Sequence, residues 1–317
     1  MQNKPPITII IPTYNRAHLI RETLDSIILQ TYTNWECIIV DDNSIDSTQK
    51  VINEYLKKEP RFNYFLRTSK YQKGASGTRN YGLDLAHKRN AQYIQFFDDD
   101  DIMYSKKLEL QIAPFLRNSN LNFTVCKFDK LVEIEPGKYR IDRPDYQLSF
   151  PHVGDAILTG DFKINTLSVL WNMKIIDQFR FDERLQHAEE WELFTRIGYH
   201  YPDNYQVVDA YLYAYRKHPV TLTMGKDDNY EKRKTSSVIR IILLEYLTKN
   251  KLHTKNSILF LTKTFLTYSY NPILVQKLLY YSQQNSGFSY KLILFLKTGL
   301  SFGKFYRKVI LKLATWV

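Results

Sequence analysis

The spacing of apolar residues alternates between two periods along the N-terminal part of the chain. Short runs rich in β-branched and aromatic residues predict strands over residues 7–11, 35–40, 62–66 and 93–97. Between these runs, apolar residues recur every three or four positions, which predicts helices over about 19–28, over 51–56 and from Thr78 onward. Strands that alternate with helices predict a mostly parallel sheet with helices on both faces.

Polar and acidic residues follow three of the predicted strands. Thr13 follows the first, Asp42 the second, and a run of four aspartates at 98–101 the fourth. Ligands of parallel sheets bind outside the carboxyl ends of the strands, so we expect these residues to line one crevice. Four adjacent carboxylates repel one another unless a cation neutralises them, and hard divalent cations prefer carboxylate oxygens. Taken alone, such a run can also be a solvated loop or a helix cap, but its position favours a binding site.

The segment after the first strand excludes a dinucleotide site of the Rossmann type. Pro-Thr-Tyr-Asn-Arg occupies residues 12–16, where Gly-x-Gly-x-x-Gly would be required. The chain also lacks a P-loop, a zinc-ligand cluster and a Gly-x-Ser-x-Gly elbow. If the ligand carries phosphate groups, we therefore expect a metal ion and side chains, rather than a glycine-rich turn, to bind them.

Eight short motifs stand in the order found in the inverting glycosyltransferases of family 2, which the chain resembles. They are Ile-Ile-Ile-Pro-Thr-Tyr-Asn-Arg (9–16), Gln-Thr-Tyr (30–32), Ile-Val-Asp-Asp-Asn-Ser (39–44), Gly-Thr-Arg-Asn-Tyr-Gly (77–82), Phe-Asp-Asp-Asp-Asp (97–101), Phe-Asp-Glu-Arg-Leu (181–185), Glu-Glu-Trp-Glu-Leu (189–193) and Tyr-Arg-Lys-His (215–218). The resemblance covers roughly residues 5–225. It implies a GT-A-like α/β fold, related to the Rossmann fold, with a mixed, mostly parallel sheet flanked by helices and a DxD-type motif.

The same resemblance implies a domain organisation. Residues 1–225 would form the glycosyltransferase domain, with about 5–110 binding the nucleotide-sugar and 111–225 binding the acceptor. Residues 226–317 would form a basic α-helical extension.

The donor site follows from the resemblance residue by residue. Thr13 and Asn15 would cradle the base and ribose. Asp42 would accept a hydrogen bond from the N3–H of a pyrimidine, which favours a UDP- or dTDP-sugar. Asp41 is either part of this site or a strand-end cap. The complete set expected to bind the nucleotide-sugar is Pro12, Thr13, Asn15, Arg16, Asp42, Arg79, Asp98 and Asp99.

The resemblance also implies a site for Mn²⁺ or Mg²⁺. Asp100 would be the metal ligand of the DxD-type motif, assisted by Asp98 and His218. A surface histidine is the alternative for His218, and the neighbouring Arg216 or Lys217 could neutralise phosphate.

Two residues beside the acidic run have other expected roles. Arg79 would face the diphosphate or form a salt bridge to the aspartates. We expect Asp101 to be an N-terminal residue of a helix over 105–115, where the helix dipole favours a carboxylate.

Sugar transfer to a hydroxyl needs a base, and the family's base aligns with Glu190. The neighbouring Glu189 would raise the pKa of Glu190 by repulsion, and Trp191 could desolvate it or form a wall of the acceptor site. Ordinary first-turn glutamates that complement a helix dipole are the alternative. Glu189 is the second candidate for the base.

Composition fits a cytoplasmic enzyme with a peripheral membrane role. The 317 residues are 44% hydrophobic and include only two cysteines, too few for a disulfide framework. The first residues do not have the pattern of a signal peptide, and we expect no spanning helix.

The positive charge is concentrated in residues 226–317, which hold sixteen Lys and Arg against four acids. Helices are expected there over 238–248, 257–268, 273–281 and 290–316. The last is basic and amphipathic, which suits an anionic membrane surface, although a helical cap or an oligomer interface would explain it too. Without a recognised nucleic-acid module, we do not expect nucleic acid as a partner.

These observations together predict a metal-dependent, inverting glycosyltransferase of hexosyltransferase type. It would move a sugar from a nucleotide donor to a glycan or lipid-linked acceptor at the inner face of the cell membrane, in cell-surface polysaccharide synthesis. A catalytically inactive binding module of the same fold is the main alternative. A sugar-phosphate nucleotidyltransferase is disfavoured because it would carry a glycine-rich loop after the first strand.

Overall fold

The computed structural model describes residues 4–135, 137–217 and 229–268. The chain separates into two compact units, one of Met1–Ile197 with Tyr201–Gly225 and one of Gly198–His200 with Lys226–Val317. The sheet and all the site residues discussed below belong to the first unit.

The first unit is built on one mixed sheet. Its strands are β1 (Ile7–Thr13), β2 (Trp35–Asp41), β3 (Phe62–Leu66), β4 (Tyr93–Phe96), β5 (Ile102–Met103), β6 (Phe123–Glu135), β7 (Lys138–Asp142), β8 (Val169–Asn172) and β9 (Tyr205–Lys217). Its helices are α1 (Ile20–Ile28), α2 (Thr48–Leu56), α3 (Ala75–Lys88), α4 (Lys107–Arg117), α5 (Val153–Thr159), α6 (Met173–Ile176) and α7 (Glu189–His200), with a 3₁₀ turn η1 (Thr166–Ser168) before β8.

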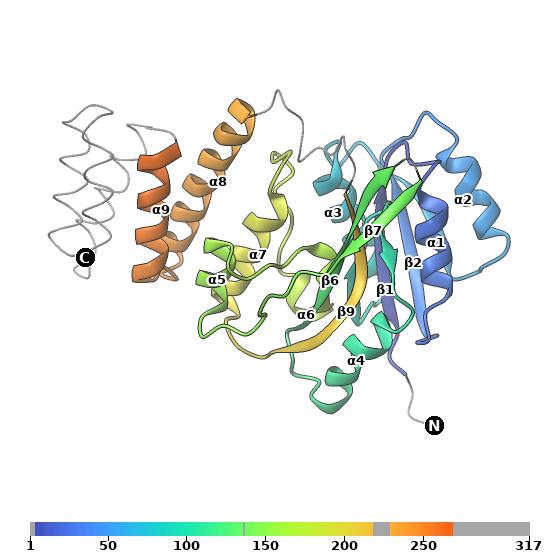
Figure 1. Cartoon of the computed structure of the whole chain (residues 1–317), viewed down its shortest axis with the longest axis horizontal. Coiled ribbons are helices and arrows are strands. Elements are labelled where there is room, and N and C mark those ends of the chain that lie inside the picture. Colours follow the sequence, from blue (N-terminus) through green and yellow to red (C-terminus); the bar gives the residue numbers. More distant parts are fainter. Residues whose placement is uncertain (1–3, 136, 218–228, 269–317) are drawn as a thin grey trace, which may run out of the picture. The chain divides into compact units, whose positions relative to one another are not determined.

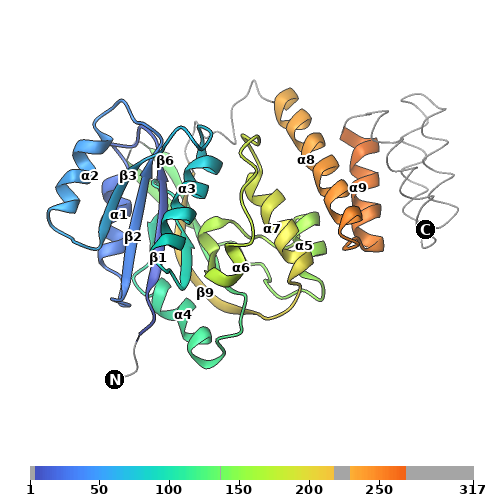
Figure 2. The ribbon, with the colours of Figure 1, turned by 180° about the vertical axis from the view of Figure 1, so that it is seen from behind.

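The strand order is β3-β2-β1-β4-β8-β6-β9-β5, and β7 pairs with β6. Strands β1 to β4 are parallel, and β4 is antiparallel to β8. The four predicted strands are therefore confirmed as the parallel half, and their carboxyl ends share one edge of the sheet. Helices α1 and α3 lie on opposite sides of β1 and β2 (Figure 1, and from behind in Figure 2).

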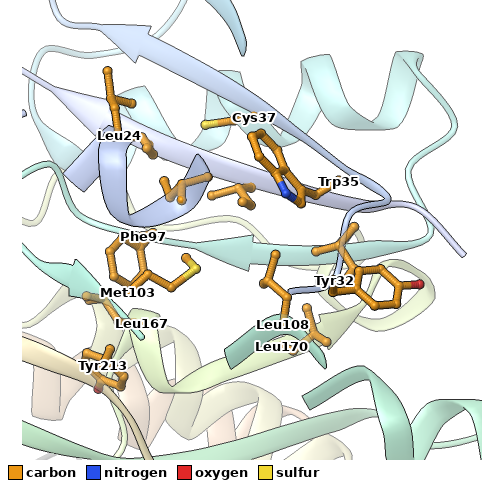
Figure 3. Close-up of a cluster of buried hydrophobic side chains, with 14 of the residues drawn as sticks. Leu24, Tyr32, Trp35, Cys37, Phe97, Met103, Leu108, Leu167, Leu170 and Tyr213 are labelled. Atoms are coloured by element: carbon orange, nitrogen blue, oxygen red, sulfur yellow. The ribbon is translucent and has the colours of Figure 1, made fainter. Parts of the chain in front are cut away.

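Alternate residues of β1 pack into two separate cores. Ile9 and Ile11 face a cluster that includes Leu24 of α1 and Leu108 of α4, which Figure 3 shows in close-up. Ile10 points to the other face, toward α3. Both faces of the strand are buried, which explains why β1 reads as a continuous apolar run.

One glycine allows α3 to approach this second face. A Cβ added to Gly82 would lie 2.4 Å from Cγ2 of Ile10, closer than carbon atoms pack. The helix that carries Arg79 is thus held directly against β1.

The second unit contains α8 (Asn229–Lys249) and α9 (Lys255–Tyr268), which contact each other. These are two of the four helices expected in the C-terminal extension, whereas the expected helices over 273–281 and 290–316 lie outside the described residues. Within the described part of the chain, no helix has the length and hydrophobicity that crossing a membrane requires.

Candidate active site

The turn after β1 is fastened to the loop after β2. Asn15 adopts a left-handed backbone with φ 53°, which asparagine tolerates better than most residues. Its N–H donates to Oγ of Ser44 at 2.9 Å, and its Oδ1 accepts from the N–H of Ile45 at 2.9 Å. Thr13, at the end of β1 after Pro12, is 3% exposed. These contacts give Asn15 a role in fixing the turn. A nucleotide contact of Pro12, Thr13 or Asn15 stays a prediction.

The two adjacent acids at the end of β2 have different environments. Asp41 accepts from the N–H of Ser44 at 2.7 Å and from the hydroxyl of Tyr64 at 2.8 Å, so it caps the strand end. Asp42 accepts from the N–H of Gly74 at 2.8 Å and from Nε of Arg67. A carboxylate has about four lone-pair positions, so Asp42 retains acceptor capacity and the predicted base contact stays open.

The loop before α3 depends on glycine and on a distant motif. A Cβ on Gly77 would lie 2.0 Å from the carbonyl oxygen of Gln72. Oε2 of Glu183 accepts from the N–H of Gln72 at 2.7 Å, and Oε1 accepts from the amide of Asn80 at 2.8 Å. The Phe-Asp-Glu-Arg-Leu motif at 181–185 therefore holds the start of α3 in place.

The four aspartates are not equivalent. The side chains of Asp98 and Asp100 are 25% and 20% exposed, whereas those of Asp99 and Asp101 are largely buried. Burial raises the pKa of Asp99 to about 7, the charge of Asp100 adds to this effect, and Arg16 opposes it. Asp98 and Asp100 are thus the two accessible carboxylates of the run.

The expectation for Asp101 was wrong. Helix α4 begins only at Lys107, and β5 lies between it and Asp101. Oδ1 of Asp101 accepts from the N–H of Arg216 at 2.6 Å, and its carbonyl accepts from the hydroxyl of Thr23 at 2.8 Å. Pairing with β9 turns this carboxylate inward, so it is not available to a helix terminus.

Three arginines surround the aspartates. Arg16 lies 3.3 Å from Asp99, and Nη2 of Arg79 donates to Oδ1 of Asp98 at 2.8 Å. Nε of Arg216 donates to the carbonyl of Asp100 at 2.8 Å. The Arg216 side chain is 1% exposed and its Nη2 binds Glu22, which does not support the idea that it neutralises phosphate.

Arg79 also reaches the start of α7, where the predicted base lies. Its Nη1 donates to Oε1 of Glu189 at 3.0 Å, and its Nη2 lies 3.6 Å from Oε1 of Glu190. Burial opposes its charge, but Asp98, Glu190 and Glu189 together raise the pKa of Arg79. The structure thus forms the salt-bridge alternative, and a contact with diphosphate stays a prediction.

Glu190, the predicted base, is partly buried and accepts a hydrogen bond. Its side chain is 25% exposed, and its Oε1 accepts from the hydroxyl of Thr166 at 2.8 Å. Burial raises its pKa to about 7, opposed by Arg79 and assisted by Asp98 and Glu189. Carboxylates with such a pKa can exchange protons near pH 7.

Trp191 has a structural role that the sequence did not indicate. Its indole N–H donates to the carbonyl oxygens of Ile157 and Leu158 at 3.1 and 3.3 Å, so it anchors α7 to α5.

The structure brings Arg79, Asp98, Glu189 and Glu190 together, while His218 lies outside the described residues.

Sequence reasoning missed three residues near the site, Arg67, Thr166 and Tyr215. Burial raises the pKa of Tyr215 to about 12, and the charges of Asp101 and Asp98 contribute. Tyr215 could have been found from the sequence, because it belongs to the Tyr-Arg-Lys-His motif. Arg67 and Thr166 belong to no motif.

Comparison with known proteins extends these observations. The family model described as Glycosyl transferase family 2 matches residues 8–174. A curated relative from Escherichia coli, UDP-Glc:alpha-D-GlcNAc-diphosphoundecaprenol beta-1,3-glucosyltransferase WfgD, is 40% identical over 123 residues. These residues are 39% of this chain and 46% of WfgD, so the match spans less than half of that relative.

Two solved structures share the fold at low sequence identity. S. aureus TarS 1–349 in complex with UDP-GlcNAc has a TM-score of 0.67 at 16% identity, covering 96% of this chain and 90% of that chain. Mannosyltransferase PcManGT from Pyrobaculum calidifontis, in complex with GDP-Man and Mn²⁺, has a TM-score of 0.51 at 16% identity, covering 98% and 84%. The likeness confirms the predicted GT-A-like α/β fold, but it does not identify a donor or an acceptor.

Proposed function

Because the chain belongs to glycosyl transferase family 2, we propose that it transfers one sugar, with inversion, from a nucleotide-diphosphate donor to a hydroxyl of a glycan or lipid-linked acceptor. A UDP- or dTDP-sugar is the favoured donor, since Asp42 can accept from a pyrimidine N3–H. The name of WfgD, with UDP-Glc and a diphosphoundecaprenol-linked acceptor, supports this choice and a role in cell-surface polysaccharide synthesis.

The observation that carries the proposal is the position of Arg79. One guanidinium binds Asp98 at 2.8 Å and Glu189 at 3.0 Å, and lies 3.6 Å from Glu190. It therefore joins the acidic run, where the donor diphosphate would bind, to the predicted base. Inverting transfer needs a base and a leaving-group site around one carbon atom.

Glu190 would take the proton of the acceptor hydroxyl as that oxygen attacks the anomeric carbon. The new carbon–oxygen bond forms on one face while the bond to the diphosphate oxygen breaks on the other, and the electron pair leaves with the diphosphate. A single displacement of this kind inverts the configuration. With a pKa of about 7, Glu190 is partly deprotonated at neutral pH and can accept the proton.

The residues present fit a divalent cation that is shared with the substrate. No group of three or more possible metal-binding side chains occurs among the described residues, but Asp98 and Asp100 offer two accessible carboxylates. Mg²⁺ is commonly held by one or two carboxylates together with substrate phosphates. Bound there, Mn²⁺ or Mg²⁺ would stabilise the charge of the departing diphosphate as a Lewis acid. The Mn²⁺ in the PcManGT complex supports this assignment, and His218 stays a further candidate ligand.

We place the reaction at the cytoplasmic face of the membrane. The excess of Lys and Arg in residues 226–317 would attract an anionic lipid surface, and a lipid-linked acceptor would be presented there.

Calorimetric titration of UDP, dTDP and GDP, first with Mn²⁺ and then with EDTA, tests the donor site. We expect one pyrimidine diphosphate to bind in a metal-dependent way. Failure of all three to bind would contradict the proposal and favour an inactive module of the same fold.

A second experiment tests the base. Glu190→Gln should leave nucleotide binding intact but lower transfer about 10²-fold or more, as the loss of a general base does. Transfer near the wild-type rate would exclude Glu190 from this role and leave Glu189 as the next candidate.

A further inference from the structure

The 3₁₀ turn η1 contacts the predicted base. It is closed by Asn165, whose Oδ1 accepts from the N–H groups of Leu167 and Ser168 at 3.1 and 3.0 Å. In return, Oγ of Ser168 accepts from the N–H of Asn165 at 3.0 Å. The hydroxyl of Tyr213 also donates to Oδ1 of Asn165, at 2.7 Å. The turn is thus completed without the side chain of Thr166.

Two buried amides brace the turn from neighbouring elements. Nε2 of Gln95, in β4, donates to the carbonyl of Leu167 at 3.0 Å. Nε2 of Gln111, in α4, donates to the carbonyl of Ser168 at 2.9 Å, and its Oε1 accepts from the buried Nζ of Lys107. Any shift of the turn would leave buried polar groups unpaired, which is costly.

The braced turn presents Thr166 to Glu190. The Thr166 hydroxyl donates to Oε1 at 2.8 Å, and the Thr166 N–H lies 3.3 Å from Oε2 as a second donor. Thr166 itself is fully buried. One residue therefore engages both oxygens of a flexible glutamate side chain.

We propose that Thr166 is a positioning residue that holds the Glu190 carboxylate in the orientation needed to take the acceptor proton. The inference rests on the proposed role of Glu190 as the base. Two hydrogen bonds from a rigid turn restrict the rotamers of Glu190, and catalysis is sensitive to such geometry.

Other charged groups also face Glu190 and remain when Thr166 is changed. Arg79 of α3 lowers the pKa of Glu190, whereas Asp98 after β4 and Glu189 of α7 raise it. The hydrogen bond from Thr166 stabilises the charged form and also lowers this pKa. Its loss should therefore move the acid limb of the pH–rate profile to higher pH.

The test compares Thr166→Val, which removes the hydroxyl but keeps the branched shape, with Thr166→Ser, which restores the hydroxyl. Thr195→Val is the matched control, since Thr195 is a buried threonine of α7 whose hydroxyl has no hydrogen-bond partner among the described residues. We expect Thr166→Val to lower kcat about ten- to a hundredfold at little change in donor KM, as for a lost hydrogen bond to a charged group. Thr166→Ser should recover both kcat and the pH profile, and Thr195→Val should match wild type.

Two further variants separate this inference from the proposed function. In a Glu190→Gln background, Thr166→Val should cause no further loss, because Thr166 acts through Glu190. If Glu190→Gln is inactive while Thr166→Val keeps the wild-type kcat and pH profile, the inference is wrong and the proposed base stands. If Glu190→Gln is active, the base assignment fails and the inference fails with it. Should thermal unfolding show that Thr166→Val does not fold, Thr166→Ala is judged by the same criteria.

Discussion

Replacement of Arg79 by methionine should destabilise the first unit in a pH-dependent way. The substitution keeps an unbranched side chain but removes a guanidinium that is 4% exposed and faces three carboxylates within 3.6 Å. Breaking a buried ion pair typically costs 3–5 kcal/mol because the remaining charge is left uncompensated. The three carboxylates are 14–25% exposed and can regain some hydration, so we expect a loss near the lower limit, about 3 kcal/mol at pH 7.5.

The sign of the pH dependence follows from Glu190. Its folded pKa of about 7 lies above the ordinary value of 4.5, so between these values the folded protein binds more protons than the unfolded chain. Stability contributed by this group is therefore lost as pH rises through that window. Removal of Arg79 raises this pKa further, so the difference in the free energy of unfolding between variant and wild type should grow mainly as the pH rises through about 7, where Glu190 ionises in the wild type but not in the variant.

Urea unfolding at several pH values between 5 and 8 measures this difference. Arg21→Met is the matched control, since Arg21 forms a single ion pair with Glu54 at the surface, 2.8 Å long, and its loss should have little effect at any pH. A loss below about 1 kcal/mol for Arg79→Met at pH 7.5, or a loss that does not change with pH, would refute the argument that Arg79 compensates these carboxylates.

Two further predictions concern the acids at the strand ends. Asp100→Ala should abolish Mn²⁺-dependent UDP binding while leaving the protein folded, and unchanged UDP affinity with Mn²⁺ would remove Asp100 from the metal site. Tyr64→Phe removes the 2.8 Å hydrogen bond to Asp41 and should lower the free energy of unfolding by about 1 kcal/mol while leaving UDP affinity unaltered. Weaker UDP binding in that variant, measured by calorimetry, would contradict the interpretation of Asp41 as a strand-end cap.

The parallel half of the sheet was predictable because two signals coincide there. The apolar runs have strand length and polar residues follow three of them, so the fold class follows from residues 7–101, whereas the family rests on the resemblance carried by the eight motifs. Both are confirmed. Local periodicity also placed two helices of the second unit.

The other part of the sheet, β5 to β9, was hidden by charged residues inside its strands. Strand β6 contains Lys127, Asp129 and Lys130, which interrupt the apolar pattern. Asp129 is nevertheless fully buried, because Tyr104 and Arg143 each bind its carboxylate at 2.8 Å. The partners are 14 and 25 residues away, so only the tertiary structure explains how a strand accommodates this charge.

Sequence patterns likewise do not reveal which distant residues contact the site residues. Thr166 meets Glu190 from 24 residues away, and Arg67 meets Asp42 from 25. Neither donor belongs to a motif, so neither could be recognised from the sequence. The donor and metal roles of the sequence-predicted residues stay predictions.

The structure also changes the physical argument for a metal ion. Repulsion among four adjacent carboxylates suggested that a divalent cation must neutralise them. Arg16 pairs with Asp99 and with Asp100, and Arg79 pairs with Asp98. The backbone N–H of Arg216 binds Asp101, so the protein itself supplies much of the compensation for all four carboxylates. The stronger argument is geometric: Asp98 and Asp100 alternate with buried neighbours and are the accessible pair, too few for a cage but suited to a cation shared with a diphosphate. A site of this kind is completed only by its substrate, which explains how the described residues can lack a three-ligand cluster and still fit metal-dependent transfer.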